Sequence, residues 1–223
     1  MKYPRTYHLP FSPGATKDDR MLKDGWFENY KGKEVVITEK LDGENTCITR
    51  YDVFARSHGA PTRTPWSANL WDKDGLFWKV KGLISPEEEV FGENLYGEHS
   101  IHYEKLKDYF HVFAVARFFE DTDKTPVWYS WNDVELLAYY LELPTVPVLW
   151  KGVFNDEIEV EAKVNELMLE PSTFGQTKEG IVMRISDEFP IDDFSKNVCK
   201  WVRPNHVQTD EHWTKNWKKA KLI

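Results

Sequence analysis

The segment from Glu39 to Asn45, with the sequence EKLDGEN, holds the residues best suited to covalent chemistry. Lys40 ends a β-branched run between carboxylates, and Gly43 allows the chain to turn closely there. A lysine amine has a pKa near 10.4, so attack at neutral pH requires a decrease of about 2 to 3 units, or about 3 to 4 kcal/mol. Flanking carboxylates raise the pKa instead. The sequence therefore predicts a metal ion or further basic groups around Lys40.

The same segment has a simpler interpretation as part of a β-hairpin. Asp42 and Gly43 could form the turn, with Lys40 exposed to solvent. Three fixed positions such as K-x-D-G recur by chance in roughly a few percent of chains of this length. The choice between a nucleophile and a surface lysine therefore depends on the rest of the sequence.

Several common nucleotide and metal sites are excluded or disfavoured by pattern. The sequence has no GxxxxGK[ST] and no GxGxxG, which excludes a P-loop or Rossmann site. His99 and His102 could share a helix face, but no third zinc ligand accompanies them. Cys47 and Cys199 form no CxxC pair, and no apolar run approaches the ~20 residues that span a bilayer. We expect a soluble, cytoplasmic protein without a membrane partner.

Short strands punctuated by glycine must position these groups, because β-branched and apolar runs dominate the sequence. The runs lie before and after the helical segments without strict βαβ alternation, so we expect an α+β fold with antiparallel sheets flanked by helices, in one domain over residues 1–223. Ala60–Ser85 is expected to leave the sheet. Helical spacing predicts helices at Trp131–Leu143, Asp156–Leu169 and Thr209–Lys221. The predicted strands are Glu34–Leu41, Asn45–Tyr51, Val53–Arg56, Val90–Tyr96, Tyr109–Phe118, Gly180–Ile185 and Asn197–Arg203.

Charge is unevenly distributed along the chain. The net charge of −8 argues against a protein that coats nucleic acid non-specifically, although it allows a local basic groove. The C-terminal stretch from Lys196 to Lys221 is basic and contains Trp201, Trp213 and Trp217. The simplest interpretation of this stretch is a core-packing helix with a basic solvent face. The alternative is a surface on which nucleobases stack.

Six short segments, in order, resemble motifs of the covalent nucleotidyltransferase superfamily, most closely ATP-dependent RNA ligases of the phage and RNA-editing type. The resemblance covers roughly residues 34–203, and Asn45 completes a KxxGxN form that is similar to RNA ligases rather than DNA ligases. The segments are Lys40–Gly43 for motif I, Arg56–Gly59 for the next motif, Phe91–Glu93 for motif III, Phe110–Phe113 for motif IIIa, Glu179–Met183 for motif IV and Val198–Trp201 for motif V.

The resemblance implies an ATP-grasp-like nucleotidyltransferase domain and a three-step reaction. Lys40 would attack the α-phosphate of ATP, expel pyrophosphate and hold AMP as a phosphoramidate. AMP would pass to a 5′-phosphorylated RNA end, and a 3′-hydroxyl would displace it. The implied cofactors are ATP and Mg²⁺, with Mn²⁺ as an alternative. The implied role is RNA repair, alongside an end-healing kinase or phosphatase.

The resemblance also implies a role for each matched residue. Lys40 and Lys200 would be catalytic, with Lys200 stabilising charge at the α-phosphate. Asp42 and Glu179 suit Mg²⁺. Arg56 would bind a phosphate or ribose, Glu93 a ribose hydroxyl, and Phe113 and Glu39 the adenine. The implied nucleotide-binding residues are Glu39, Lys40, Asn45, Arg56, Glu93, Phe113, Glu179 and Lys200.

Structural alternatives stay open for most of these residues. Phe113 lies in an apolar run typical of a core strand, and Arg56, Glu93 and Glu179 could be ordinary charges at strand ends. Lys200 is different, because an alternating strand would place it on the face opposite its apolar neighbours.

Motif V departs from the family, whose members usually have two lysines separated by one residue. Val198 and Val202 flank Lys200 at that spacing, so Arg203 or Lys196 would have to substitute. The residues after Arg203 are too few for an OB-fold, so we expect the catalytic domain to act alone. Two rival functions remain: a small ATP-dependent DNA ligase or other polynucleotide nucleotidyltransferase, and a non-catalytic nucleotide or RNA sensor.

Overall fold

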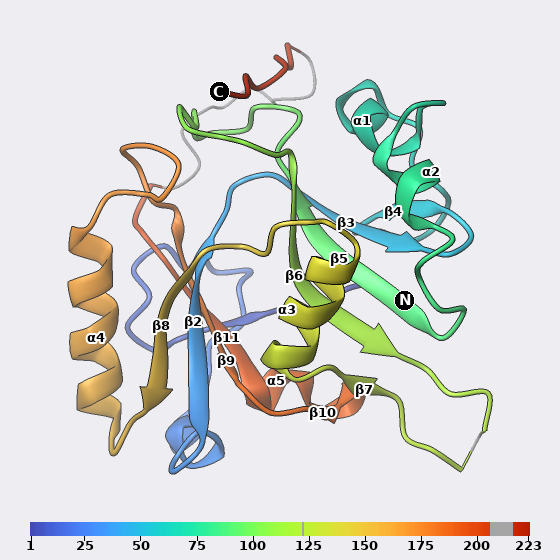
Figure 1. The fold of residues 1–223 in the computed structure, drawn as a ribbon. Helices are drawn as coiled ribbons and strands as arrows, with labels where there is room; N and C mark the ends of the chain where they lie inside the picture. The colour runs from blue at the N-terminus through green and yellow to red at the C-terminus, as the bar shows by residue number, and fades with distance from the viewer. Residues whose placement is uncertain (122, 206–215) are drawn as a thin grey trace.

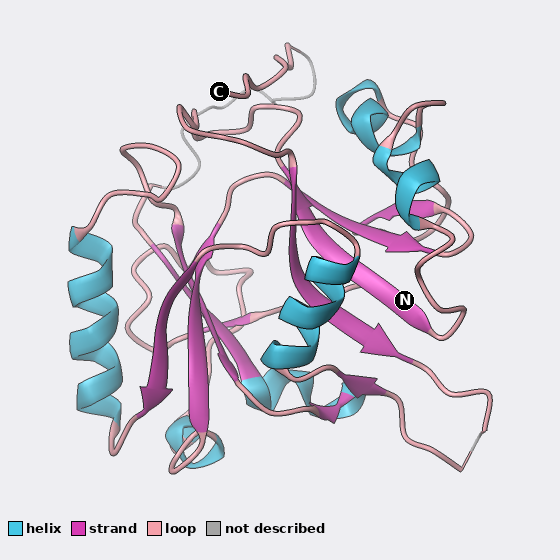
Figure 2. Cartoon of the chain, viewed as in Figure 1, coloured by secondary structure: helices cyan, strands magenta, loops and turns pink. Residues whose placement is uncertain are grey.

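The computed structural model describes residues 1–121, 123–205 and 216–223, which form an α+β fold around two β-sheets (Figures 1 and 2). The five-stranded sheet has the order β1-β11-β9-β2-β8, and the six-stranded sheet has the order β10-β7-β6-β5-β3-β4. Every pairing between these strands is antiparallel except that of β1 with β11. The structure confirms the predicted antiparallel α+β class. The strands are β1 (Tyr7–His8), β2 (Glu34–Lys40), β3 (Glu44–Thr49), β4 (Val53–Ala55), β5 (Glu88–Asn94), β6 (Phe110–Arg117), β7 (Val127–Trp128), β8 (Val148–Val153), β9 (Gly180–Ile185), β10 (Phe189–Pro190) and β11 (Val198–Val202).

The five-stranded sheet has two chemically different faces because side chains alternate along its strands. Thr38, Val182 and Lys200 lie in one row across β2, β9 and β11, on the face that looks toward the other sheet. Ile37 and Cys199, one position away, are buried in the core that also contains residues of α4 (Glu157–Leu169). Figure 1 shows α4 covering the outer side of this sheet. Polar groups can therefore gather between the sheets while the outer face stays apolar.

The six-stranded sheet contains a β-bulge beside the space between the sheets. Phe91 on β5 pairs with Ala114 on β6, and Gly92 pairs with Val112, so Phe113 is an extra residue with no partner in the ladder. A bulge bends its strand and re-aims a side chain. Phe113 is only partly buried, and it lines a cavity while it packs against the edge of the core.

Two of the predicted helices form close to their expected bounds. Helix α3 (Trp131–Tyr140) begins after Ser130, whose side chain accepts a hydrogen bond from the N–H of Asp133, and α4 begins after Asp156, which caps the N–H of Glu159. None of the described helices is long and apolar enough to cross a membrane. The remaining short helices are η1 (Trp26–Asn29), η2 (Pro65–Ser67), α1 (Ala68–Trp71), α2 (Leu76–Val80), η3 (Ile191–Asp193) and α5 (Phe194–Asn197).

The C-terminal helix is the one predicted element that the structure corrects. Residues 209–215 of Thr209–Lys221 lie outside the described residues, and residues 216–221 are not helical. The N–H of Ala220 donates to the carbonyl of Tyr96, and Lys219 forms a β-bridge with Gly97. Pairing with the loop after β5 therefore replaces the local helical pattern. As expected, Ala60–Ser85 leaves the sheet, where it forms η2, α1 and α2.

Candidate active site

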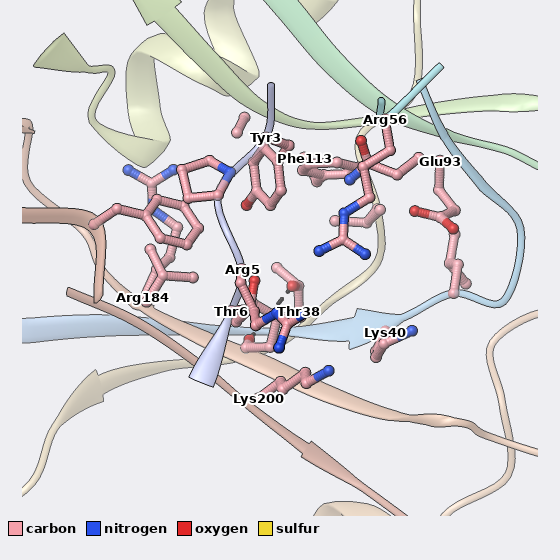
Figure 3. A pocket seen from close by; sticks show the side chains of 18 of the residues that line it. Tyr3, Arg5, Thr6, Thr38, Lys40, Arg56, Glu93, Phe113, Arg184 and Lys200 are labelled. Carbon is pink, nitrogen blue, oxygen red and sulfur yellow. Dashed lines mark hydrogen bonds between the residues drawn. The ribbon is translucent and has the colours of Figure 1, made fainter. Parts of the chain in front are cut away.

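A cavity of about 960 Å³ lies between the two sheets, and most of the predicted site residues line it (Figure 3). Lys40 and Lys200 reach it from the five-stranded sheet, while Glu93 and Phe113 reach it from the six-stranded sheet. Arg56 enters from the loop after β4. The structure thus brings together residues that are up to 160 positions apart in the sequence.

Lys40 stands at the point where the chain passes from one sheet to the other. It ends β2 of the five-stranded sheet, whereas the next strand, β3, belongs to the six-stranded sheet. The hairpin interpretation is therefore wrong. Gly43 is required in this crossing, because a Cβ there would lie 2.6 Å from the carbonyl oxygen of Asn94. The Lys40 side chain is 26% exposed, and its Nζ lies 2.6 Å from Oε2 of Glu179.

Carboxylates dominate the electrostatics around the Lys40 amine. Burial lowers its pKa, but the charges of Glu179, Glu93 and Asp42 raise it, and the net result is a pKa above the ordinary lysine value. The decrease that a nucleophilic amine requires is therefore not supplied by the described residues around Lys40. Lys40 is therefore a protonated, ion-paired amine here, and reaction requires a change in the charge that surrounds it.

Lys200 behaves as its alternating strand predicts. Its neighbours Cys199 and Trp201 are buried in the core, while Lys200 lines the cavity. Burial and the nearby charge of Lys40 lower the pKa of Lys200, and Asp19, whose Oδ1 lies 4.0 Å from Nζ, partly offsets them. Lys200 therefore brings a second cation to the cavity, close enough to Lys40 for their charges to interact.

Neither residue predicted to supply a second motif V cation lines the cavity. Lys196 is exposed, and its Nζ lies 2.6 Å from Oδ1 of Asp193. The guanidinium of Arg203 donates to the carbonyls of Pro204 and Asn205 outside the cavity. Another residue must supply any further positive charge to the site.

Glu93 lines the cavity, and its pKa is strongly raised. Burial, followed by the charges of Glu179 and Asp42, raises its pKa to about 8, although Lys40 and the N–H of Gly43 act in the opposite direction. The Gly43 N–H donates to Oε1 of Glu93 at 3.0 Å. Glu93 is thus half protonated near pH 8 and can either donate or accept a hydrogen bond.

Apolar side chains around Phe113 line part of the cavity, which we call the Phe113 slot, and an unpaired acceptor also lines the cavity. Phe113 and Val182 line it from opposite sheets, and the Tyr3 ring meets Phe113 edge-on with centroids 5.1 Å apart. The Oδ1 atom of Asn45 is buried and has no hydrogen-bond partner among the described residues. Since buried acceptors are rarely left unpaired, Asn45 fits a ligand that brings a donor.

Two predicted site residues use their carboxylates to hydrogen-bond neighbouring loops. The carboxylate of Glu39 accepts hydrogen bonds from the Ser172 hydroxyl at 2.5 Å and the Thr173 N–H at 2.9 Å. Oδ2 of Asp42 accepts the N–H groups of Ser100 and Ile101 at 2.8 and 2.9 Å. Both carboxylates fix loops that surround the site, and Asp42 does not line the cavity.

Tyr3, Arg5 and Arg184 are among the cavity residues that the sequence did not predict. Tyr3 and Arg5 come from the N-terminal segment, and Arg184 from β9 is fully buried against the rings of Trp131 and Phe189. Period-2 alternation in β9 places Arg184 on the face of Val182, which was an available signal. No local pattern marks the N-terminal segment.

His99 and His102 do not share a helix face. The segment from His99 to His102 is not helical. His102 is exposed and bonds Glu98, whereas His99 lies 3.9 Å from Asp42.

Several solved structures share the fold of this chain. It has the fold of a Naegleria gruberi RNA ligase mutant solved with ATP and Mn, at 17% identity over 90% of this chain and 60% of that one, with a TM-score of 0.56. An archaeal ATP-dependent RNA ligase matches at 15% identity over 90% and 48%, with a TM-score of 0.55. An Aquifex aeolicus protein assigned as an ATP-dependent DNA ligase matches at 17% over 90% and 49%, with a TM-score of 0.53.

The chain thus spans between 48% and 60% of the length of these solved proteins. Comparison with curated proteins gave no match. The sequence model of the RNA ligase family matches residues 33–202, which include every residue of the site predicted from the sequence. This chain belongs to the RNA ligase family.

Proposed function

We propose that the chain is an ATP-dependent RNA ligase that joins 3′-hydroxyl and 5′-phosphate RNA ends through a lysyl-AMP intermediate on Lys40. The observation that carries this proposal is the convergence of Lys40, Lys200 and Arg56 on one cavity that also contains the Phe113 slot. An amine, further cations and an apolar slot for a base are the groups that adenylyl transfer uses. Family membership and the ATP-dependent ligases of the same fold support it.

Lys40 provides the nucleophile. Its Nζ first releases a proton to water, and the lone pair then attacks the α-phosphorus of ATP; the nitrogen releases a second proton to water as the phosphoramidate forms. The bond from that phosphorus to the bridging oxygen breaks, and pyrophosphate leaves with the electron pair. Lys200 and Arg56 bind phosphate oxygens as negative charge accumulates on them. The carboxylate of Glu179, at 2.6 Å, holds the Lys40 proton before attack.

The nucleoside fits the inner part of the cavity. The adenine stacks on Phe113, and Val182 supplies a further apolar contact from the cavity wall. The unpaired Oδ1 of Asn45 accepts a hydrogen bond from the ligand, and Glu93 bonds a ribose hydroxyl. Glu39 acts indirectly, since its carboxylate fixes the loop at Ser172 and Thr173.

The residues around Lys40 also fit a divalent cation. Glu179 presents a carboxylate oxygen 2.6 Å from the Lys40 amine, and carboxylate oxygens are the donors that Mg²⁺ and Mn²⁺ prefer. Asp42 fits this role less well, because Oδ2 already accepts two backbone N–H groups. Bound Mg²⁺ would supply positive charge that favours the neutral form of the Lys40 amine and stabilises the phosphates.

The decisive experiment looks for covalent AMP on the protein. We expect wild type, mixed with Mg²⁺ and ATP labelled on the α-phosphate, to give a labelled protein band, and Lys40→Ala to give none. Lys151→Ala is the matched control, because Lys151 also pairs with a glutamate, Glu135, at 3.0 Å but lies on the edge strand β8. Label retained in Lys40→Ala would remove Lys40 from the nucleophile role. Unlabelled wild type that still binds ATP would make the chain a sensor.

A second assay addresses the substrate and the biological role. We expect faster sealing of RNA than of DNA ends, with a 5′-phosphate and a 3′-hydroxyl both required. Preferential sealing of nicked DNA would establish the rival ligase activity. The proposed role in repair would place an end-healing kinase or phosphatase upstream wherever the RNA ends lack these termini.

A further inference from the structure

The N-terminal segment forms one rim of the cavity. Tyr3, Arg5 and Thr6 all line it, and Figure 3 shows Arg5 beside the strand that carries Lys200. The two residues that follow Thr6 form β1, which pairs in parallel with β11 so that His8 lies opposite Lys200. The segment therefore enters the cavity beside β11, the strand that carries Lys200. Lys200 is itself proposed to bind phosphate oxygens.

Both sides of Arg5 are firmly held. On one side, the Tyr3 ring packs edge-on against Phe113 and Phe194 with centroids 5.1 Å away in each case, and against Trp128 at 5.5 Å. On the other side, the N–H of Leu9 donates to the carbonyl of Lys200 at 2.8 Å. The backbone of Arg5 is thus fixed at the rim, while its exposed side chain can adjust to a ligand.

The guanidinium of Arg5 has unused hydrogen-bonding capacity. It donates from Nη1 to the carbonyl of Asp18 at 2.9 Å, and no carboxylate of the described residues lies within ion-pair distance. A guanidinium has five N–H donors in a planar fork. By contrast, Lys40 is paired with Glu179, and Arg184 donates to two backbone carbonyls. Arg5 therefore offers most of its donors to the cavity.

We propose that Arg5 is a further phosphate-binding residue, whose guanidinium binds a phosphate oxygen of the ATP triphosphate. This inference rests on the proposed function. A triphosphate carries several negative charges, and a planar arginine fork binds phosphate oxygens in two parallel hydrogen bonds. Arg5 supplies the positive charge that Lys196 and Arg203 do not bring to the site.

Binding of a non-reactive nucleotide tests this role. The affinities of the α,β-methylene analogue of ATP and of adenosine would be measured with Mg²⁺ for wild type, Arg5→Ala and Arg5→Lys. We expect Arg5→Ala to weaken analogue binding about tenfold and to leave adenosine binding unchanged. Arg5→Lys keeps the positive charge but lacks the planar fork of donors. Its affinity for the analogue should lie between those of wild type and Arg5→Ala. Lys2→Ala, which removes an exposed charge three residues away and outside the cavity, should match wild type.

Other binding results would contradict either the role of Arg5 or the proposed function itself. Equal weakening of analogue and adenosine, or a lower melting temperature, would show that Arg5 only supports the rim. Full analogue affinity in Arg5→Ala would overturn the role of Arg5 while the proposed function stands. A wild type that binds neither ligand would overturn the proposed function, and the role of Arg5 with it.

Discussion

Replacing Glu93 with glutamine should make the protein more stable at alkaline pH while it impairs nucleotide chemistry. The carboxylate lies at the cavity wall, where burial and the charges of Glu179 and Asp42 raise its pKa to about 8 from 4.5. The folded chain therefore binds more protons at Glu93 than the unfolded chain does between these two values. Its contribution makes the free energy of unfolding fall as pH rises through this window.

The size of the effect follows from the shift. One pKa unit corresponds to about 1.4 kcal/mol, so the full shift would cost about 3 to 4 kcal/mol between pH 5 and pH 8. The Glu93 carboxylate lines a cavity that water can enter, and solvent screening reduces this value. We expect the stability of Glu93→Gln relative to wild type to rise by about 2 kcal/mol from pH 5 to pH 8. Glutamine keeps an oxygen for the Gly43 N–H.

Urea unfolding of both proteins at pH 5, 6, 7 and 8 measures the difference and its slope. Glu34→Gln is the control, because Glu34 lies exposed at the start of β2 and should show no such trend. A stability difference between wild type and Glu93→Gln that stays constant across these pH values, or that decreases as pH rises, would refute the argument that Glu93 is protonated by its surroundings.

Three further outcomes follow from the same geometry. Asp42→Ala should lower the free energy of unfolding by about 1 to 3 kcal/mol, measured in urea, because two loop N–H groups lose their acceptor. Gly92→Ala should cost about 1 to 3 kcal/mol in the same assay, since its Cβ would lie 2.3 Å from the Phe110 ring. Phe113→Ala should weaken binding of α,β-methylene ATP by about 1 to 3 kcal/mol, measured by calorimetry, and unchanged affinity would exclude stacking.

Strands with strong local signals were predicted well from the sequence. Glu34–Lys40 and Gly180–Ile185 match their expected ranges within a residue, because both are β-branched and bounded by turn residues. Val148–Val153 was missed, since this edge strand lies in an acidic region and none of its residues is fully buried. Tyr7–His8 could not be found by periodicity, because two residues carry none and only the distant partner β11 defines the strand.

Short motifs predicted which residues belong to the site, but they did not predict the direction of every side chain. The cavity contains Lys40, Arg56, Glu93, Phe113 and Lys200, each of which is marked by a short motif. Asp42 and Glu39 also stand in motif I, yet their carboxylates are used by loops that come from elsewhere in the chain. The sequence states which residue types are present near Lys40, whereas only the fold decides which of their side chains face the amine.

The charges around Lys40, the nucleophile of the proposed function, favour its unreactive ammonium form. Carboxylates raise its pKa, so the amine is held as an ammonium ion at Glu179. The same carboxylate oxygens are ligands of the kind that divalent cations prefer, and the cavity also contains Arg5, Arg56 and Lys200 for phosphates. Under the proposed function, a bound divalent cation would favour the reactive neutral amine, because its positive charge would offset the carboxylates that keep Lys40 protonated.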